Sequence, residues 1–263
     1  MTLGHALFLL AASAIAGAVN SVAGGGTLLS FPAAIAAGLP PIVANATNAV
    51  ALVPGSLAAA WAYRAWLVGL GRLVALLSAP AVAGALIGAT ILRHTPQRLF
   101  DGVVPWLVLG ATVLLLWQGV LRRRAPTAAS VEAPASGRAV ARVVFFQFLV
   151  SIYGGYFGAA MGIVMLAFLG YLPAIETRGR LDLHQMNALK NVLAVVINAA
   201  ASISFIMNGL VDARAAALMA VGAIAGGIIG GRLARRAQAH HVRRLVVAIG
   251  FGMTVLLAWR RYG

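Results

Sequence analysis

The stretch "NSVAGGGTLLSFP", residues 20–32, lies between two runs that are almost wholly apolar. Three consecutive glycines are unfavourable inside a helix, since each costs about 1 kcal/mol relative to alanine. Glycine also accepts positive φ angles and lets a ligand approach the main chain closely. The stretch therefore predicts a break in an apolar helix.

The composition indicates a membrane protein. Of 263 residues, 62% are hydrophobic and only 10% are charged, whereas a soluble domain has about 25% charged residues. Long apolar runs recur along the whole chain, as α-helices in a bilayer require. We therefore expect an all-α polytopic protein of the cell inner membrane, in contact with the lipid bilayer.

The net charge of +15 does not indicate a nucleic-acid-binding protein. The basic residues lie between the apolar runs, where cytoplasmic loops carry them, instead of gathering on one soluble face. Nucleic acid is therefore not an expected partner.

The apolar runs form two series with the same order of lengths: short, short, long, long and long. The first comprises 3–20, 24–38, 42–62, 69–92 and 99–121, and the second comprises 139–152, 157–172, 187–208, 213–231 and 244–259. A polar linker, "RRRAPTAASVEAPASGR" (122–138), separates them. We expect two transmembrane repeats, 1–121 and 139–263, each opening with a broken helix pair followed by three spanning helices.

The helices of each pair are too short to cross the membrane singly. A helix of 15 residues is about 22 Å long, whereas the hydrocarbon core is about 30 Å thick. We expect half-helices that meet near mid-membrane. Each broken pair is either a re-entrant hairpin or two short spans, and the sequence does not decide between these alternatives. Unwound backbone at that depth needs protein or a polar cavity to satisfy its N–H and C=O groups.

The basic residues orient the two repeats. If each broken pair makes an even number of crossings, each half makes an odd number, and the halves are inverted relative to each other. With the linker in the cytoplasm, 15 of the 20 lysines and arginines then face inward. Those that face out are Arg93, Arg98, Arg214, Arg260 and Arg261. The positive-inside rule therefore predicts inverted repeats with both termini outside.

Two helix N-termini are expected at the breaks, one near Thr27 and one near Ala159 in "GAAMG" (158–162). The N-terminus of a helix presents free N–H groups and the positive end of its dipole. Two such ends at one point predict an anion site. The alternative is that small residues only allow close helix packing, which is our interpretation of Gly84, Gly88 and 222–231.

Three longer stretches contain these motifs: "VNSVAGGGTLLSFPAAIAAGLPPIVANATNAVAL" (19–52), "YGGYFGAAMGIVML" (153–166) and "NALKNVLAVVINAAASISF" (187–205). Together they resemble the TauE/SafE family of sulfite and organosulfonate transporters. The resemblance implies a multi-pass inner-membrane permease for small sulfur-containing anions. The chain departs from the family pattern in "GAAMG", which has two glycines in place of a glycine-rich run.

Polar side chains inside the apolar runs supply further candidates. Asparagine in hydrocarbon is costly and faces protein or a cavity, which draws attention to Asn48 and to Asn191 and Asn198 on one helix face. Interhelical hydrogen bonding is an equal alternative for these asparagines. Lys190, the only lysine, is either an anion ligand or an anchor whose ammonium reaches the cytoplasmic surface.

The sequence favours a secondary transporter, or permease, for small anions, above all sulfite or organosulfonates, bound near the membrane midplane. An anion channel is the first alternative, and a membrane-embedded enzyme or assembly factor is the second. No catalytic constellation or metal-ligand cluster is apparent, so we expect no enzyme, no metal and no cofactor. Whether the chain forms a homodimer is left open. The substrate-binding residues that we expect are Asn20, Ser21, Gly24, Gly25, Gly26, Thr27, Asn48, Gly158, Gly162, Lys190, Asn191 and Asn198.

Cysteine labelling tests the topology in this cysteine-free chain. We expect Tyr262→Cys to react with a membrane-impermeant maleimide in whole cells, because the C-terminus is outside. Ser130→Cys should stay protected until the cells are permeabilised, because the linker is cytoplasmic. The reverse pattern would contradict the inverted repeats.

Overall fold

The computed structural model describes residues 2–22, 25–124, 137–169, 181–233 and 239–262, and all regular secondary structure in this part of the chain is helical. Six of these helices are long and apolar enough to cross a membrane (α1, α3, α4, α5, α8 and α9), which confirms the prediction of an all-α polytopic membrane protein. The elements are α1 (Leu3–Val22), α2 (Thr27–Ala36), α3 (Pro41–Ala62), the 3-10 helix η1 (Arg64–Leu67), α4 (Gly71–His94), α5 (Gln97–Arg124), α6 (Gly137–Tyr156), α7 (Met161–Leu169), α8 (Leu183–Met207), α9 (Ala213–Leu233) and α10 (Ala239–Tyr262).

Both predicted helix breaks are present. The described residues 25–26 and 157–160 are not helical, and they precede a helix of 10 residues (α2) and a helix with 9 described residues (α7). At 1.5 Å per residue these helices are about 15 Å long, which is half the thickness of a bilayer core. α1 is longer than expected, since its 20 residues suffice to span by length alone.

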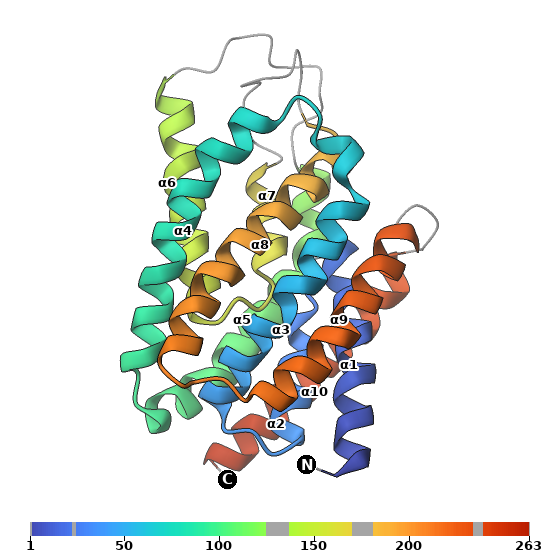
Figure 1. Ribbon diagram of the computed structural model, residues 1–263, viewed down its shortest axis with the longest axis vertical. Helices are drawn as coiled ribbons and strands as arrows, with labels where there is room; N and C mark the ends of the chain where they lie inside the picture. Colours follow the sequence, from blue (N-terminus) through green and yellow to red (C-terminus); the bar gives the residue numbers. More distant parts are fainter. Residues whose placement is uncertain (1, 23–24, 125–136, 170–180, 234–238, 263) are drawn as a thin grey trace.

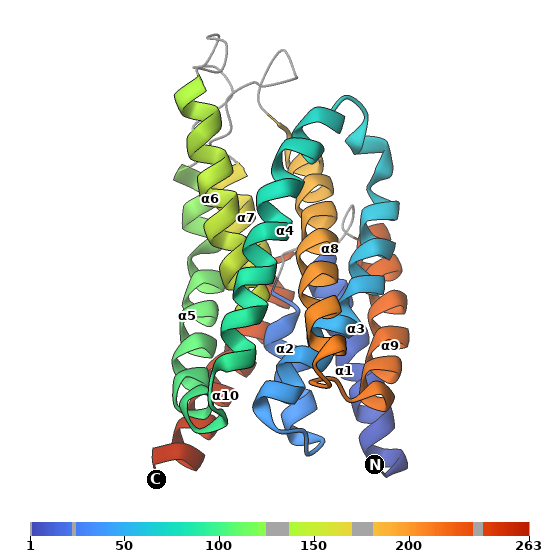
Figure 2. The ribbon, with the colours of Figure 1, turned by 60° about the vertical axis from the view of Figure 1, so that its left-hand side comes forward.

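The two broken pairs point in opposite directions (Figures 1 and 2). α1 and α2 both extend from the middle of the molecule to the end that carries the chain termini, whereas α6 and α7 extend from the middle to the other end. Each pair therefore turns back near mid-height. Both termini lie at one end, as the predicted topology requires, while residues 125–136 of the linker lie outside the described part of the chain.

Helix contacts are exchanged between the halves in a regular way. α1 packs along α9, and α6, the first helix of the second half, packs along α4, the fourth helix of the first half. The third helices follow the same rule, since α3 contacts α9 and α8 contacts α4. Equivalent helices of the two halves also meet, α3 with α8 and α5 with α10. Two repeats related by a two-fold axis produce this pattern. The inverted repeat stays a prediction, which the exchange and the opposed pairs support.

Glycines bring the backbones of the exchanged helices together. At Gly84 and Gly88 of α4, an added Cβ would overlap main-chain atoms of α6 around Phe148 and Ile152. At Gly222, Gly226 and Gly230 of α9, it would overlap atoms of α1, including the carbonyl oxygens of Leu10, Ala14 and Ala18. The packing interpretation of Gly84, Gly88 and 222–231 is confirmed.

Substitution of one glycine by alanine tests this packing. Gly226→Ala should lower stability by about 1–3 kcal/mol, the usual effect of overpacking, because the methyl group would overlap the Ala14 carbonyl oxygen. Gly110→Ala is the matched control, since Gly110 lies in α5 with no atom within 4 Å of its added Cβ, and alanine favours the helix. The melting temperature of the detergent-purified protein measures both effects. Equal melting temperatures for Gly226→Ala and the parent would contradict the packing.

Candidate functional site

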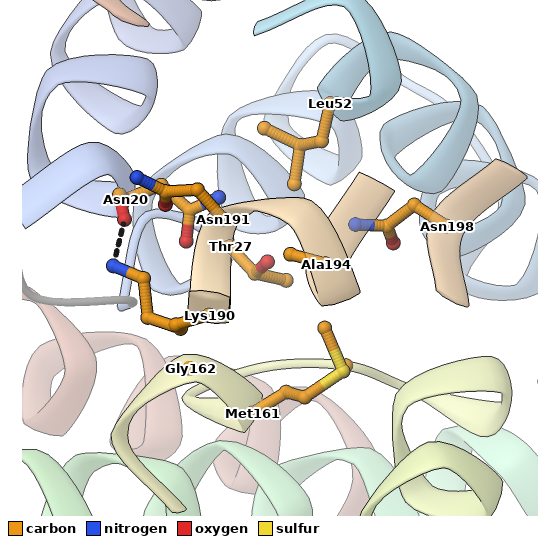
Figure 3. Close-up of a pocket in the computed structure, with 10 residues that line it drawn as sticks. Asn20, Thr27, Leu52, Met161, Gly162, Lys190, Asn191, Ala194 and Asn198 are labelled. Carbon is orange, nitrogen blue, oxygen red and sulfur yellow. Dashed lines mark hydrogen bonds between the residues drawn. The ribbon is translucent and has the colours of Figure 1, made fainter. Parts of the chain in front are cut away.

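A small polar cavity lies where the two helix breaks approach each other (Figure 3). Its volume is about 10 Å³, which is the room for about one water molecule. Six elements or breaks contribute: the end of α1, the start of α2, α3, the break before α7, the start of α7, and α8. The lining residues are Asn20, Thr27, Leu52, Gly158, Met161, Gly162, Lys190, Asn191, Ala194 and Asn198.

Most of the predicted site residues meet at this cavity. Those that line it are Asn20, Thr27, Gly158, Gly162, Lys190, Asn191 and Asn198. Ser21 contributes its carbonyl oxygen, which accepts from Lys190 and Asn191. Gly25, Gly26 and Asn48 are described but do not line the cavity, and Gly24 lies outside the described residues.

The helix N-termini at the cavity are close to where the sequence placed them. α2 begins at Thr27, and α7 begins at Met161, two residues after the expected Ala159. Thr27 and Gly162 both line the cavity from the first turn of their helix. Other first-turn N–H groups of these helices donate to carbonyl oxygens of the breaks, as Leu28 does to Gly25 and Met161 to Gly158. The positive ends of two helix dipoles therefore face the same small space.

The turn before α7 contains strained backbone. Gly158 has a φ of +73°, which glycine adopts readily, but Ala160 has a φ of +58°, which is uncommon for a residue with a Cβ. Ala160 thus takes a left-handed conformation within the "GAAMG" motif, which departs from a glycine-rich run. The hydroxyl of Tyr153 donates to the Ala159 carbonyl and ties the turn to α6. Tyr153 was not predicted, although it belongs to the "YGGYFG" motif.

Lys190 is buried, with 1% of its surface exposed. Its Nζ atom donates to the carbonyl oxygens of Asn20 (3.0 Å) and Ser21 (3.3 Å) and to Asn187 Oδ1 (3.3 Å). An ammonium has three N–H donors, so all of them are used. The interpretation of Lys190 as an anchor at the cytoplasmic surface is therefore wrong, because its ammonium reaches the end of α1 inside the protein (Figure 3).

The carboxylates in the described part of the chain do not pair with Lys190. Asp101, Asp182 and Asp212 instead accept hydrogen bonds from Gln97, Gln185 and Ala215, at the start of α5, α8 and α9. Among the described residues, the atoms that accept from the Lys190 ammonium are all neutral oxygens, two of them at the negative end of the α1 dipole.

The end of α6 is held in the same way by a neutral side chain. Asn45 of α3 donates through Nδ2 to the carbonyl oxygen of Tyr156 at a distance of 2.9 Å. In each half, the end of the broken first helix is thus bonded by a side chain from the third helix of the other half. Asn45 was not predicted, and only its position inside the quoted "NATNAVAL" segment could have drawn attention to it.

The glycines of the first break differ in their surroundings. An added Cβ at Gly25 would contact Leu115 at 3.5 Å and Ile163 at 3.8 Å, which are ordinary distances. At Gly26 it would overlap the Ala16 carbonyl oxygen, so Gly26 allows the start of α2 to pack against α1. Asn48 is buried, and its Oδ1 atom has no hydrogen-bond partner within the described residues.

Comparisons with known proteins identify the family. The model of the family "Sulfite exporter TauE/SafE" matches residues 9–257. "Probable membrane transporter protein ORF9" of Sinorhizobium sp. is 29% identical over 95% of this chain and 91% of the relative. "Probable membrane transporter protein YfcA" of Escherichia coli K12 is 28% identical over 95% and 88%. No solved structure matches. This chain, a multi-pass protein of the inner membrane, belongs to the TauE/SafE family of membrane transporters.

Proposed function

We propose that this protein is a secondary transporter for small oxyanions, with sulfite or organosulfonates as its substrates. The observation that carries the proposal is the buried ammonium of Lys190, which has no carboxylate partner within the described residues and borders a cavity where two helix N-termini meet. The Lys190 ammonium and the positive dipole ends of α2 and α7 border this cavity, whereas the negative end of α1 is bonded by Lys190 itself. A small anion is the ligand that such a site stabilises.

The charge on Lys190 exceeds what the fold needs at this position. Asn45 holds the equivalent end of α6 with a neutral amide, so a neutral side chain suffices to bond the last carbonyls of a broken helix. A buried ammonium without a counter-ion is costly. An anion in the adjoining cavity offsets that cost, and the ammonium acts on it through its charge, because its three N–H groups are already engaged.

The polar groups around the cavity suit an oxyanion. The hydroxyl of Thr27 and the side-chain amides of Asn191 and Asn198 are hydrogen-bond donors, and the positive dipole ends of α2 and α7 add to the attraction for an anion. Sulfite and sulfonates present several oxygen acceptors around one sulfur atom, which these donors can bind from different directions. The name of the matching family, "Sulfite exporter TauE/SafE", supports sulfur oxyanions as the substrate class.

The size of the cavity favours a carrier over a channel. A space for about one water molecule has no room for an oxyanion, so substrate binding requires the helices around it to move apart. A carrier that opens alternately to the two sides makes such a movement, with its site between inverted repeats. The proposal also holds that this protein transports its substrate without chemically changing it.

Melting temperatures test the substrate class. We expect sulfite or an organosulfonate such as taurine or sulfoacetate to stabilise the purified protein, since a ligand stabilises the state that it binds. Sulfate and thiosulfate are the comparison anions. Counterflow in proteoliposomes, in which internal unlabelled substrate accelerates uptake of labelled substrate, then separates a carrier from a channel. No response to any of the five compounds would overturn the proposal.

Removal of one charge tests the role of Lys190. Lys190→Gln keeps an amide donor but removes the ammonium, and it should raise the sulfite concentration needed for half of the melting shift by about tenfold or more. Arg72→Gln is the matched control, because it removes one positive charge from an exposed position at the start of α4. Arg72→Gln should respond to sulfite as the parent does. An unchanged response in Lys190→Gln would exclude the ammonium from anion binding.

A further inference from the structure

The surroundings of the Lys190 ammonium are those of a bound metal cation. Two backbone carbonyl oxygens and one amide oxygen converge on Nζ at 3.0–3.3 Å. All three are neutral, and the two carbonyls belong to the last described turn of α1, at the negative end of its dipole. Carbonyls at the end of a broken transmembrane helix are the ligands that carriers use for coupling cations such as Na⁺.

The ammonium and its two carbonyl ligands come from different halves of the chain. Asn20 and Ser21 end the first helix of the first half, whereas Lys190 and Asn187 lie on α8 in the second half. The ammonium fills the oxygen site in this conformation, because every N–H group has an acceptor and the side chain is buried. A cation from solution therefore cannot bind at this position while the ammonium occupies it.

We propose that Lys190 serves as a built-in cation, which occupies a cation site at the carbonyl end of α1 and makes dissolved Na⁺ unnecessary for anion binding. The site takes small monovalent cations, either a primary ammonium or an alkali metal ion. The part of this proposal that concerns anion binding rests on the proposed function, whereas the presence of the cation site does not.

The cation site is tested first in chloride salts, without sulfite or a sulfonate. The parent should melt at the same temperature in chloride salts of Na⁺, K⁺ and N-methyl-D-glucamine at equal ionic strength, because its site is filled. Lys190→Ala removes the side chain beyond Cβ, and n-propylammonium restores the missing atoms. We expect n-propylammonium, and Na⁺ more weakly, to raise the melting temperature of Lys190→Ala with increasing concentration.

Two controls separate this effect from unspecific cation binding. Tetramethylammonium carries the same charge as n-propylammonium but has no N–H donor, so it should leave Lys190→Ala unchanged. Lys190→Met fills the space of the lysine stem without a charge, so neither n-propylammonium nor Na⁺ should stabilise it. If Lys190→Ala folds but responds to no cation, or responds equally to tetramethylammonium, the cation site is refuted.

A measurement on the parent alone keeps the proposal open to refutation if Lys190→Ala does not fold. A parent that is stabilised specifically by Na⁺ contradicts a filled site. The parent's melting shift with sulfite should also be the same in Na⁺ and in N-methyl-D-glucamine, within about twofold in concentration. If sulfite raises the melting temperature of the parent only in Na⁺, the proposal of a built-in cation is overturned. If no anion raises the melting temperature, but Lys190→Ala still responds to cations, only the proposed function is overturned.

Discussion

The structure depends on one constraint: the backbone polar groups at two helix breaks must be satisfied inside a membrane. Water is absent at that depth, so each exposed N–H and C=O group needs a partner from the protein or the ligand. At the ends of α1 and α6, Lys190 and Asn45 bond the carbonyls from the opposite half. At the starts of α2 and α7, which border the cavity, first-turn N–H groups donate to carbonyls of the breaks, as Leu28 does to Gly25 and Met161 to Gly158. The protein thus satisfies backbone groups on both sides of each break, and what remains for the proposed anion is the positive dipole end of each short helix.

Local sequence predicts much of this fold because helix breaks and helix packing have local signals. The glycine run predicted where α1 ends and α2 begins to within a few residues, and the small-residue spacing in 222–231 predicted the close contact with another helix. The breaks also indicated which segments would meet, so that most of the expected site residues line one cavity.

The direction of individual side chains could not be predicted, because it depends on contacts between distant segments. The sequence around Lys190 fits an ammonium that reaches the surface as well as one that turns inward, and only the position of α1 beside α8 decides between them. Gly25 and Gly26 are neighbouring glycines that the sequence does not distinguish, yet Gly25 has room for a Cβ and Gly26 does not. Ala160 in a left-handed conformation likewise follows from the turn that α6 and α7 must share.

The glycine contacts between exchanged helices have a mechanical consequence. Where Gly226 and Gly88 bring two backbones together, neither helix can slide along the other without a collision of main-chain atoms. α1 is therefore coupled to α9, and α6 to α4, as rigid bodies that each combine elements from both halves. A movement that opens the cavity must separate these mixed bodies from each other. In the proposed carrier, the units that move are therefore these mixed bodies and not the two predicted repeats.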